Sequence, residues 1–262
     1  MNESTKTRLD AIIDEGYEFR FGDYIGQGFN IAQKNVGGFV LFALVFFLIV
    51  IIVNFIPVIG SLANQFFLGP CLTAGAYLVA NQVRKGRESQ FGDFFKGFNF
   101  AGQLALTAVF MTIIIMIAML PFIFFGGGKE LFQWYMELIQ NPAMAEEGLS
   151  VPWEPSVISF LLLLPVIYFA VAYQWAYLFV IFYGFNFWDA LEYSRRMITR
   201  KWFVFFAFLI VISIIAAAGL ILLCIGILFT LPAMWCMNLS AFADVTQLDA
   251  EGVETTIEEH LL

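Results

Sequence analysis

Three aspartates recur in similar short strings and are the first candidates for chemistry. The strings read FGDY, FGDF and FWDA. Each Asp stands where an amphipathic helix would begin, so its carboxylate can accept hydrogen bonds from free backbone N–H groups and meet the positive end of the helix dipole. None has, within its motif, the partner carboxylate that acid–base catalysis or metal binding would use. We therefore interpret Asp23, Asp93 and Asp189 as helix caps.

Two clusters of basic residues are the second candidates, because such clusters beside a membrane span can hold the anionic headgroups of lipids. The alternative is that they only determine topology, which Lys and Arg do in nearly every membrane protein and which is the commoner role. The members of the two clusters are Arg84, Lys85 and Arg87, and Arg195, Arg196, Arg200 and Lys201.

The residue combinations of the common enzyme classes are missing from the sequence. The single histidine, His260, lies in an acidic tail, so imidazole-based metal sites and catalytic pairs have no imidazole in the apolar part of the chain. Cys71, Cys224 and Cys236 lie separately within apolar runs, without the spacing of a disulfide framework or metal knuckle. No phosphate-binding or dinucleotide-binding glycine motif is present. We therefore predict that the protein is not an enzyme and has no cofactor, no metal site and no nucleic-acid partner.

The composition indicates what surrounds these residues. Hydrophobic residues make up 61% of the 262 residues and charged residues only 13%, whereas a soluble domain has about 25% charged residues. Most of the surface must therefore face lipid, which a helix crosses with roughly 20 apolar residues. The predicted spans are Val36–Pro57, Leu62–Val83, Gly102–Phe125, Ser156–Tyr183 and two spans within Trp202–Ala243, divided near Cys224–Gly226.

The positions of the 13 basic residues predict the orientation of the chain. Four precede the first span, four lie between the second and third, and four lie between the fourth and fifth, which leaves only Lys129 on the other side. The positive-inside rule places both termini in the cytoplasm and the loop 126–155 outside. Apolar residues of that loop have helical spacing, which predicts a short amphipathic helix that caps the bundle or docks a periplasmic partner. These residues are Phe132, Tyr135, Met136 and Ile139.

The recurring aspartate strings also predict an internal repeat. Apolar residues follow each string at helical spacing, the stripe of the first helix extends back loosely to Leu9, and a span begins about ten to fifteen residues after each Asp. We predict an all-α polytopic bundle of six spans in three hairpins, each preceded by a cytoplasmic interfacial amphipathic helix. The alternative is a chance recurrence in a chain with 32 Phe. The second span of each hairpin carries a proline, namely Pro70, Pro165 and Pro232.

The predicted membrane domain covers residues 1–245. Its repeat units cover about 21–90, 91–186 and 187–245, and residues 246–262 form an acidic cytoplasmic tail.

Two segments resemble a broad bacterial group of membrane proteins. The group includes the membrane domain attached to some glycerophosphodiester phosphodiesterases and several related integral membrane families. The first segment runs from GAY at 75–77 to RKG at 84–86 and continues with FGDFFKGF at 91–98. The second segment contains FWDAL at 187–191 and SRR at 194–196, followed by Trp202, Gly226 and Pro232. The resemblance covers roughly residues 21–245 and implies a multi-pass protein of the bacterial cytoplasmic membrane without an established activity. The sequence contains no soluble phosphodiesterase domain, so that enzyme activity is not carried over.

Three classes of function are left, and the sequence ranks them. A non-enzymatic scaffold, assembly factor or subunit, which organises membrane lipids or a protein partner in a complex, is favoured by the absence of charge at the span centres. A transporter or flippase-like carrier of a lipid or small amphiphile is the alternative, favoured by the repeat and the prolines. A membrane enzyme ranks last. A cavity lined by Asn54, Tyr77, Gln174 or Asn238 would favour the carrier, whereas a flat apolar flank or tight co-purification with another protein would favour the scaffold. Neutral amides in spans more often bond a neighbouring helix than a substrate.

Overall fold

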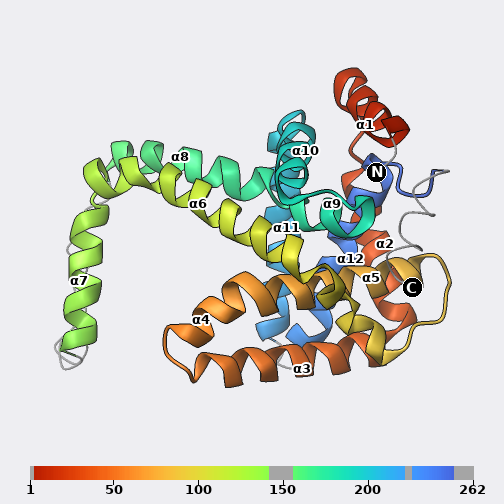
Figure 1. Ribbon diagram of the computed structural model, residues 1–262, viewed down its shortest axis with the longest axis horizontal. Helices are drawn as coiled ribbons and strands as arrows, with labels where there is room; N and C mark the ends of the chain where they lie inside the picture. Colours follow the sequence, from red (N-terminus) through yellow and green to blue (C-terminus); the bar gives the residue numbers. More distant parts are fainter. Residues whose placement is uncertain (1–2, 142–155, 222–225, 251–262) are drawn as a thin grey trace. The chain divides into compact units, whose positions relative to one another are not determined.

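The computed structural model describes residues 3–141, 156–221 and 226–250, and within these ranges the regular structure is helical, without strands (Figure 1). The predicted all-α class is therefore confirmed for the described residues. The chain forms two compact units, Met1–Phe110 with Val171–Leu262, and Met111–Ala170. In chain order, the helices are α1 (Glu3–Glu15), α2 (Phe21–Lys34), α3 (Val36–Asn54), α4 (Ile59–Ala63), the π-helix η1 (Asn64–Leu68), α5 (Gly69–Arg84), the 3-10 helix η2 (Phe91–Phe100), α6 (Ala101–Phe125), α7 (Gly128–Gln140), α8 (Val157–Ala172), α9 (Ala176–Tyr183), α10 (Phe187–Thr199), α11 (Trp202–Ile221) and α12 (Ile227–Val245).

Within the described residues, six helical stretches are long and apolar enough to cross a membrane, as the sequence predicted. They indicate a multi-pass integral membrane protein, because water does not solvate so much apolar surface. The stretches are Val36–Asn54, Ile59–Arg84, Phe91–Phe125, Val157–Tyr183, Trp202–Leu220 and Ile227–Val245.

The second and fourth spans depart from simple α-helices along their length. The second span winds as the π-helix η1 just before Pro70, whose missing N–H removes one hydrogen bond of a regular helix. The fourth span is broken into α8 and α9 at Tyr173–Trp175. The long apolar stretch at the C-terminal end forms two separate helices, α11 and α12, which pack side by side and are joined by a bond from the Thr230 hydroxyl to the Ala216 carbonyl at 2.9 Å.

Two of the six spans are largely buried, and we call these central and the four mostly exposed ones peripheral. Of the apolar stretches of α5 and α12, 67% and 61% is buried inside the protein, against 11–22% for the four other spans. Small residues allow this burial, because α5 presents Ala74, Ala76 and Ala80 to its neighbours, all with no exposed surface. The apolar surface of the peripheral spans faces outward instead, where lipid can cover it.

The helices that carry the three aspartates each pack on a different inner segment: α2 on α12, η2 on α5 and α10 on α9. Glycines bring two of these pairs together. A Cβ added to Gly28 of α2 would lie 2.6 Å from both the N and the Cα of Met237 in α12. In the other pair, Gly97 of η2 faces the backbone of Gly75 in α5. The backbones therefore touch, which only glycine permits at these positions.

The predicted stripe of phenylalanines on η2 rests on the protein itself along one edge. Phe94 is buried and stacks on Phe42 of α3, with ring centroids 4.4 Å apart. Phe98 contacts Phe67 of η1 at 5.9 Å, whereas Phe91 is partly exposed. Phe94 and Phe98 of this stripe therefore pack on the helix bundle.

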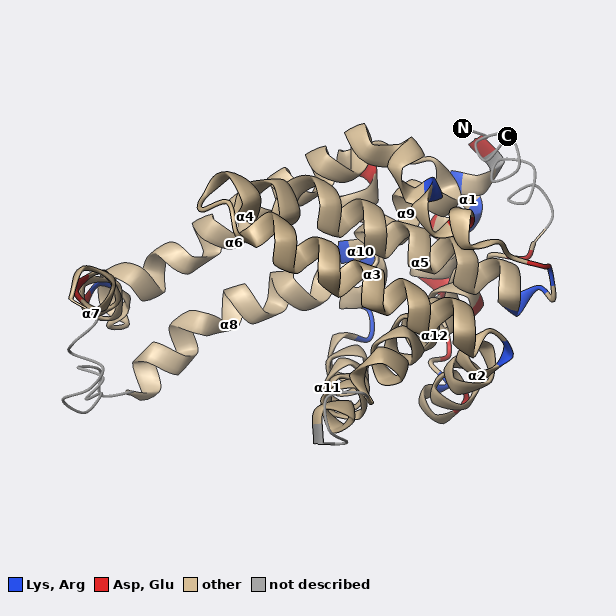
Figure 2. Ribbon diagram, turned by 90° about the horizontal axis from the view of Figure 1, so that it is seen from below, with Lys and Arg blue, Asp and Glu red and all other residues tan. Residues whose placement is uncertain are grey.

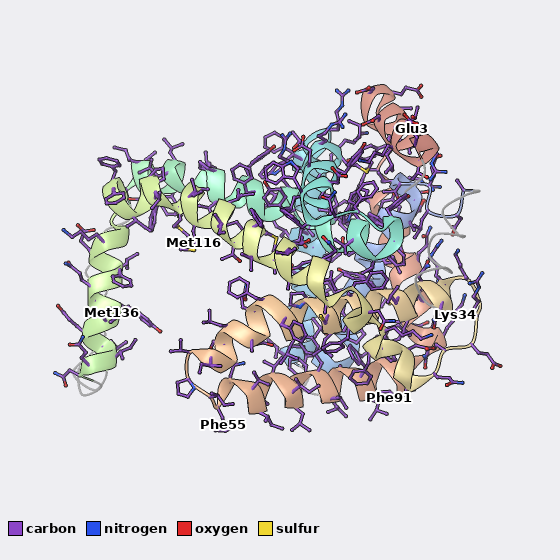
Figure 3. All side chains as sticks on the ribbon, in the orientation of Figure 1. Glu3, Lys34, Phe55, Phe91, Met116 and Met136 are labelled. Atoms are coloured by element: carbon purple, nitrogen blue, oxygen red, sulfur yellow. The ribbon has the colours of Figure 1, made fainter. Side chains whose placement is uncertain are left out.

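The turn between α3 and α4 contains a strained residue. Val58 has φ +62° and ψ −61°, and the Ile59 N–H donates to the Pro57 carbonyl at 2.7 Å, which closes a γ-turn around it. A β-branched residue rarely adopts this conformation. The turn is apolar and exposed, with Phe55 at its outer edge (Figure 3).

The N-terminal segment forms a helix of its own rather than an extension of α2. The loose stripe from Leu9 predicted one continuous helix, but α1 ends at Glu15 and α2 starts at Phe21. The break is at Gly16, whose φ of +85° ends a right-handed helix. Leu9 and Ile13 of α1 are nevertheless buried, so the stripe faces the protein.

In the unit Met111–Ala170, α7 runs crosswise to the adjoining parts of α6 and α8 (Figures 1 and 2). Gly127 makes the turn with φ +89°, and a Cβ on Gly128 would lie 2.7 Å from the Ile123 Cα. The amphipathic helix predicted from the spacing of Phe132 to Ile139 is present as α7. Residues 142–155 of the predicted outer loop lie outside the described residues.

Candidate functional site

Each of the three aspartates is the third residue of its helix and therefore lies three residues after the N-cap residue. At the start of η2, the Gln90 backbone N–H donates to Asp93 Oδ2 at 2.9 Å, and the Gln90 side chain accepts from the Asp93 backbone. This reciprocal pair is a capping box. Lys96 also pairs with Asp93 at 3.0 Å. Asp93 is therefore held by local bonds at the start of its helix.

The two other aspartates have different surroundings. At α10 the cap is Asn186, whose side chain accepts from the Trp188 and Asp189 backbone N–H groups at 3.0 and 2.9 Å. Asp189 itself accepts from Lys6 of α1 at 2.8 Å. The Glu192 carboxylate, one turn further along α10, pairs with Arg195. Asp23 lies in the first turn of α2, where the capping residue contributes no side-chain bond.

The first basic cluster is bonded to a short segment that follows α12. Both terminal nitrogens of Arg84 donate to the Asp249 carboxylate at 2.6 Å, and Lys85 lies 3.7 Å from it. The Arg84 guanidinium holds the pKa of Asp249 below its ordinary value of 3.8. Arg87 is exposed. Leu248 beside Asp249 is buried, so this part of the predicted tail packs on the protein, and 251–262 lies outside the described residues.

The second basic cluster fastens α1 to α10. Arg196 donates to Asp10 at 2.8 Å. Arg200 donates from Nε to the Ile13 carbonyl at 2.7 Å, at the end of α1 where carbonyls lack helical partners. Lys201 stands over the Tyr17 ring at 6.0 Å. Together with Arg195, which pairs with Glu192 of its own helix, all four cations of this cluster have contacts within the protein.

A pocket of about 290 Å³ lies next to the Arg84–Asp249 pair. Asp244, at the end of α12, accepts from the Tyr24 hydroxyl at 2.6 Å and also pairs with Arg20. Burial and the neighbouring carboxylate raise the pKa of Tyr24 to about 12, so its hydroxyl keeps its proton. The residues that line the pocket are Gln27, Arg84, Ser240, Ala243, Asp244, Gln247, Asp249 and Ala250.

Inside the bundle, polar groups bond one another. The Trp175 indole N–H donates to Asn238 Oδ1 at 3.0 Å, and Asn238 Nδ2 donates to the Tyr77 hydroxyl at 2.8 Å. These bonds join α12, α5 and the break in the fourth span. Ser194 of α10 bonds the backbone groups that are freed at the break. Its hydroxyl accepts from the Trp175 backbone N–H at 3.1 Å and donates to the Ala172 carbonyl at 2.7 Å. Backbone groups freed inside a membrane must find such partners.

The other deep amides named from the sequence lie elsewhere. Asn54 donates to the Val50 carbonyl at 2.7 Å and accepts from Ser61 at 3.1 Å, both near the α3–α4 turn. Gln174 is exposed in the break between α8 and α9. The residues expected to line a carrier's cavity are therefore not gathered in one place, and two of them belong to the bonded group of Tyr77, Trp175 and Asn238.

The described residues contain no group of His, Cys, Asp or Glu that could hold a metal ion. Cys71 and Cys236 are buried free thiols. Cys224 and His260 lie outside the described residues.

No protein-family model, curated protein or solved structure matches this chain. The site must therefore be interpreted from its own geometry. Sequence reasoning found the basic clusters but missed their acidic partners Asp10 and Asp249, and it also missed the pair of Arg20 with Asp244. No local signal marks these partners, because each ion pair joins residues that are far apart in the sequence.

Proposed function

We propose that this protein is a non-enzymatic component of the bacterial cytoplasmic membrane, namely a scaffold, assembly factor or subunit of a membrane complex. The observation that supports the proposal is the bonded group of Tyr77, Trp175 and Asn238. Its donors and acceptors satisfy one another across three segments. Polar groups in a carrier's path would instead be free to bind cargo, whereas these fix the relative positions of helices.

The basic residues support the same proposal. Arg84, Arg196 and Arg200 are bonded to Asp249, to Asp10 and to the end of α1 respectively. They fasten the short helices and the segment after α12 to the bundle. A guanidinium has five N–H donors, so contact with lipid headgroups remains compatible with these pairs and is part of the proposal. The cytoplasmic placement of this end rests on the positive-inside rule.

We also propose that the three aspartate-bearing helices belong to repeated units. Support comes from their common position for the aspartate and from the packing of each helix on an inner segment of the bundle. The residues of the bacterial resemblance, including Gly75, Gly97 and Ser194, lie at these contacts. Kinship with that group would then reflect shared packing rather than a shared reaction.

A reconstitution experiment separates the scaffold from the carrier. Vesicles of phosphatidylethanolamine and phosphatidylglycerol, containing a fluorescent phosphatidylethanolamine, are prepared with and without the protein. Dithionite then reports how much label has moved between leaflets. A scaffold leaves the rate at that of protein-free vesicles. A rate that rises in proportion to protein, and that falls in the Asn238→Leu variant, would instead establish the carrier.

A crosslinking experiment tests the scaffold directly in native membranes. A photoreactive amino acid is placed at exposed positions on three peripheral spans, Ile51, Met116 and Ile214, and at the buried control position Ala76. The proposal expects one of the three faces to give a protein adduct of discrete mass, and Ala76 to give none. Lipid adducts alone at all three faces would contradict a role in a protein complex.

A further inference from the structure

Helix α7 has one apolar face and one polar face. Phe132, Tyr135, Met136 and Ile139 follow helical spacing and are between 38% and 63% exposed. Their neighbours on the same side, Leu131, Trp134 and Leu138, are only partly covered. The opposite face carries the charged and amide side chains, which are Lys129, Glu130, Gln133, Glu137 and Gln140. A helix of this kind must place its apolar face against something other than water.

The position of α7 indicates what that environment is. It follows α6 after the turn at Gly126 and Gly127, so it starts where the third span ends. Within its compact unit it runs crosswise to α6 and α8, both of which are parts of candidate spans (Figures 1 and 2). A helix crosswise to spans lies along the membrane surface rather than through it.

The turn fixes this direction. A Cβ on Gly126 would lie 2.9 Å from the Phe122 carbonyl oxygen, and one on Gly128 would lie 2.7 Å from the Ile123 Cα. Gly127 adopts φ +89°, which side chains other than glycine rarely allow. The consecutive glycines therefore form a tight corner between the span and the surface helix.

We propose that α7 is an interfacial helix whose apolar face lies in the headgroup–acyl boundary of the leaflet opposite the basic clusters. With one Lys against two Glu, it has no charge attraction for anionic lipids, so its attachment depends on burial of the aromatic and aliphatic side chains. Trp134 and Tyr135 suit the headgroup level, where one side of a ring is apolar and the other wet. The proposal is independent of whether the bundle acts as a scaffold or as a carrier.

Fluorescent labels on the two faces test the proposal. Single cysteines at Met136 or Ile139 report the apolar face, and single cysteines at Gln133 or Glu137 are matched controls on the polar face. The background carries Cys224→Ser, because Cys71 and Cys236 are buried and stay unlabelled in the folded protein. Each variant is reconstituted into phosphatidylethanolamine–phosphatidylglycerol vesicles, with and without bromine-labelled phosphatidylcholine.

Insertion of the apolar side chains by about 5–10 Å predicts opposite quenching on the two faces. Bromolipid should quench labels at positions 136 and 139, aqueous iodide should quench those at 133 and 137, and the ratio of the two effects should differ roughly tenfold between faces. Equal quenching of all four labels by iodide would show that α7 stands free in water. Protection of positions 136 and 139 from both quenchers would show a protein partner instead. Either result overturns the proposal.

Discussion

The contact between α2 and α12 makes two glycines of the same helix respond oppositely to the same substitution. Gly28 faces the Met237 backbone, and an added Cβ would lie 2.6 Å from two of its backbone atoms. Gly26, two residues earlier, has nothing within 4 Å of the same added atom. Gly28→Ala should therefore destabilise the protein, and Gly26→Ala should stabilise it.

The magnitudes follow from the distances. Carbon atoms pack at about 3.5–4.0 Å, so Gly28→Ala forces the helices roughly 1 Å apart and forfeits about a quarter to a half of each dispersion contact there. Such overpacking costs about 1–3 kcal/mol, offset in part by the 0.5–1 kcal/mol or so that Ala gains over Gly within a helix. Gly26→Ala receives only that gain. Because the gain is common to both, the two variants should differ by the overpacking cost of about 1–3 kcal/mol, which corresponds to roughly 2–12 °C in unfolding temperature.

A thiol-reactive fluorophore measures this difference in detergent in a Cys224→Ser background, because Cys71 and Cys236 are buried and react only when the protein unfolds. Met237→Ala combined with Gly28→Ala shortens the opposing side chain but leaves the backbone in place, so it should restore only part of the loss. If Gly28→Ala unfolds at the same temperature as Gly26→Ala, or at a higher one, the helices do not touch at this position and the reasoning fails.

Three further predictions concern bonds, pH and strain. Tyr77→Phe removes the acceptor for Asn238 Nδ2 and should lower the free energy of unfolding by about 1 kcal/mol, as measured by the same melting assay; no loss would mean that the bond is not formed. Because Arg84 lowers the pKa of Asp249 below 3.8, the stability due to this pair is present above pH 3.8 and is lost as the pH falls through the lowered pKa. The unfolding temperatures of wild type and Asp249→Asn should therefore differ by a constant amount at neutral pH and converge only below pH 3.8, and earlier convergence would contradict the pairing. Val58→Gly removes a strain of about 1–3 kcal/mol at a positive φ and, after the entropy cost of glycine, should stabilise the protein by about 1 kcal/mol; a lower melting temperature would show that Val58 is unstrained.

The number of spans and the helix α7 could be predicted from the sequence because each depends on a local pattern. Roughly 20 apolar residues identify a span wherever it lies in the fold. Likewise, the spacing of Phe132 and Ile139 identifies an amphipathic helix. The breaks were harder to foresee. Pro70 indicates one irregularity, but the interruption at Tyr173–Trp175 depends on Ser194, which is distant in sequence and satisfies the freed backbone groups.

The identity of the central spans was not predicted, although the sequence held a signal for it. α5 and α12 are the least apolar of the six spans and the most buried. Between helices in lipid there is little hydrophobic driving force, so small residues and polar bonds hold the centre while the greasiest helices face the acyl chains. The low hydropathy of these two spans, together with Gly75 and Asn238, was the available indication.

The packing of α2 on α12 has a consequence for biosynthesis. The ribosome delivers α2 near the beginning of translation, whereas the surface around Met237 emerges with the last span. Until then the Gly28 side of α2 has no docking surface, and a nascent chain stalled before residue 227 can hold that helix only by its contacts with α3, α5 and Phe208 of α11. Protection of α2 from added protease should therefore become complete only with the insertion of the final span.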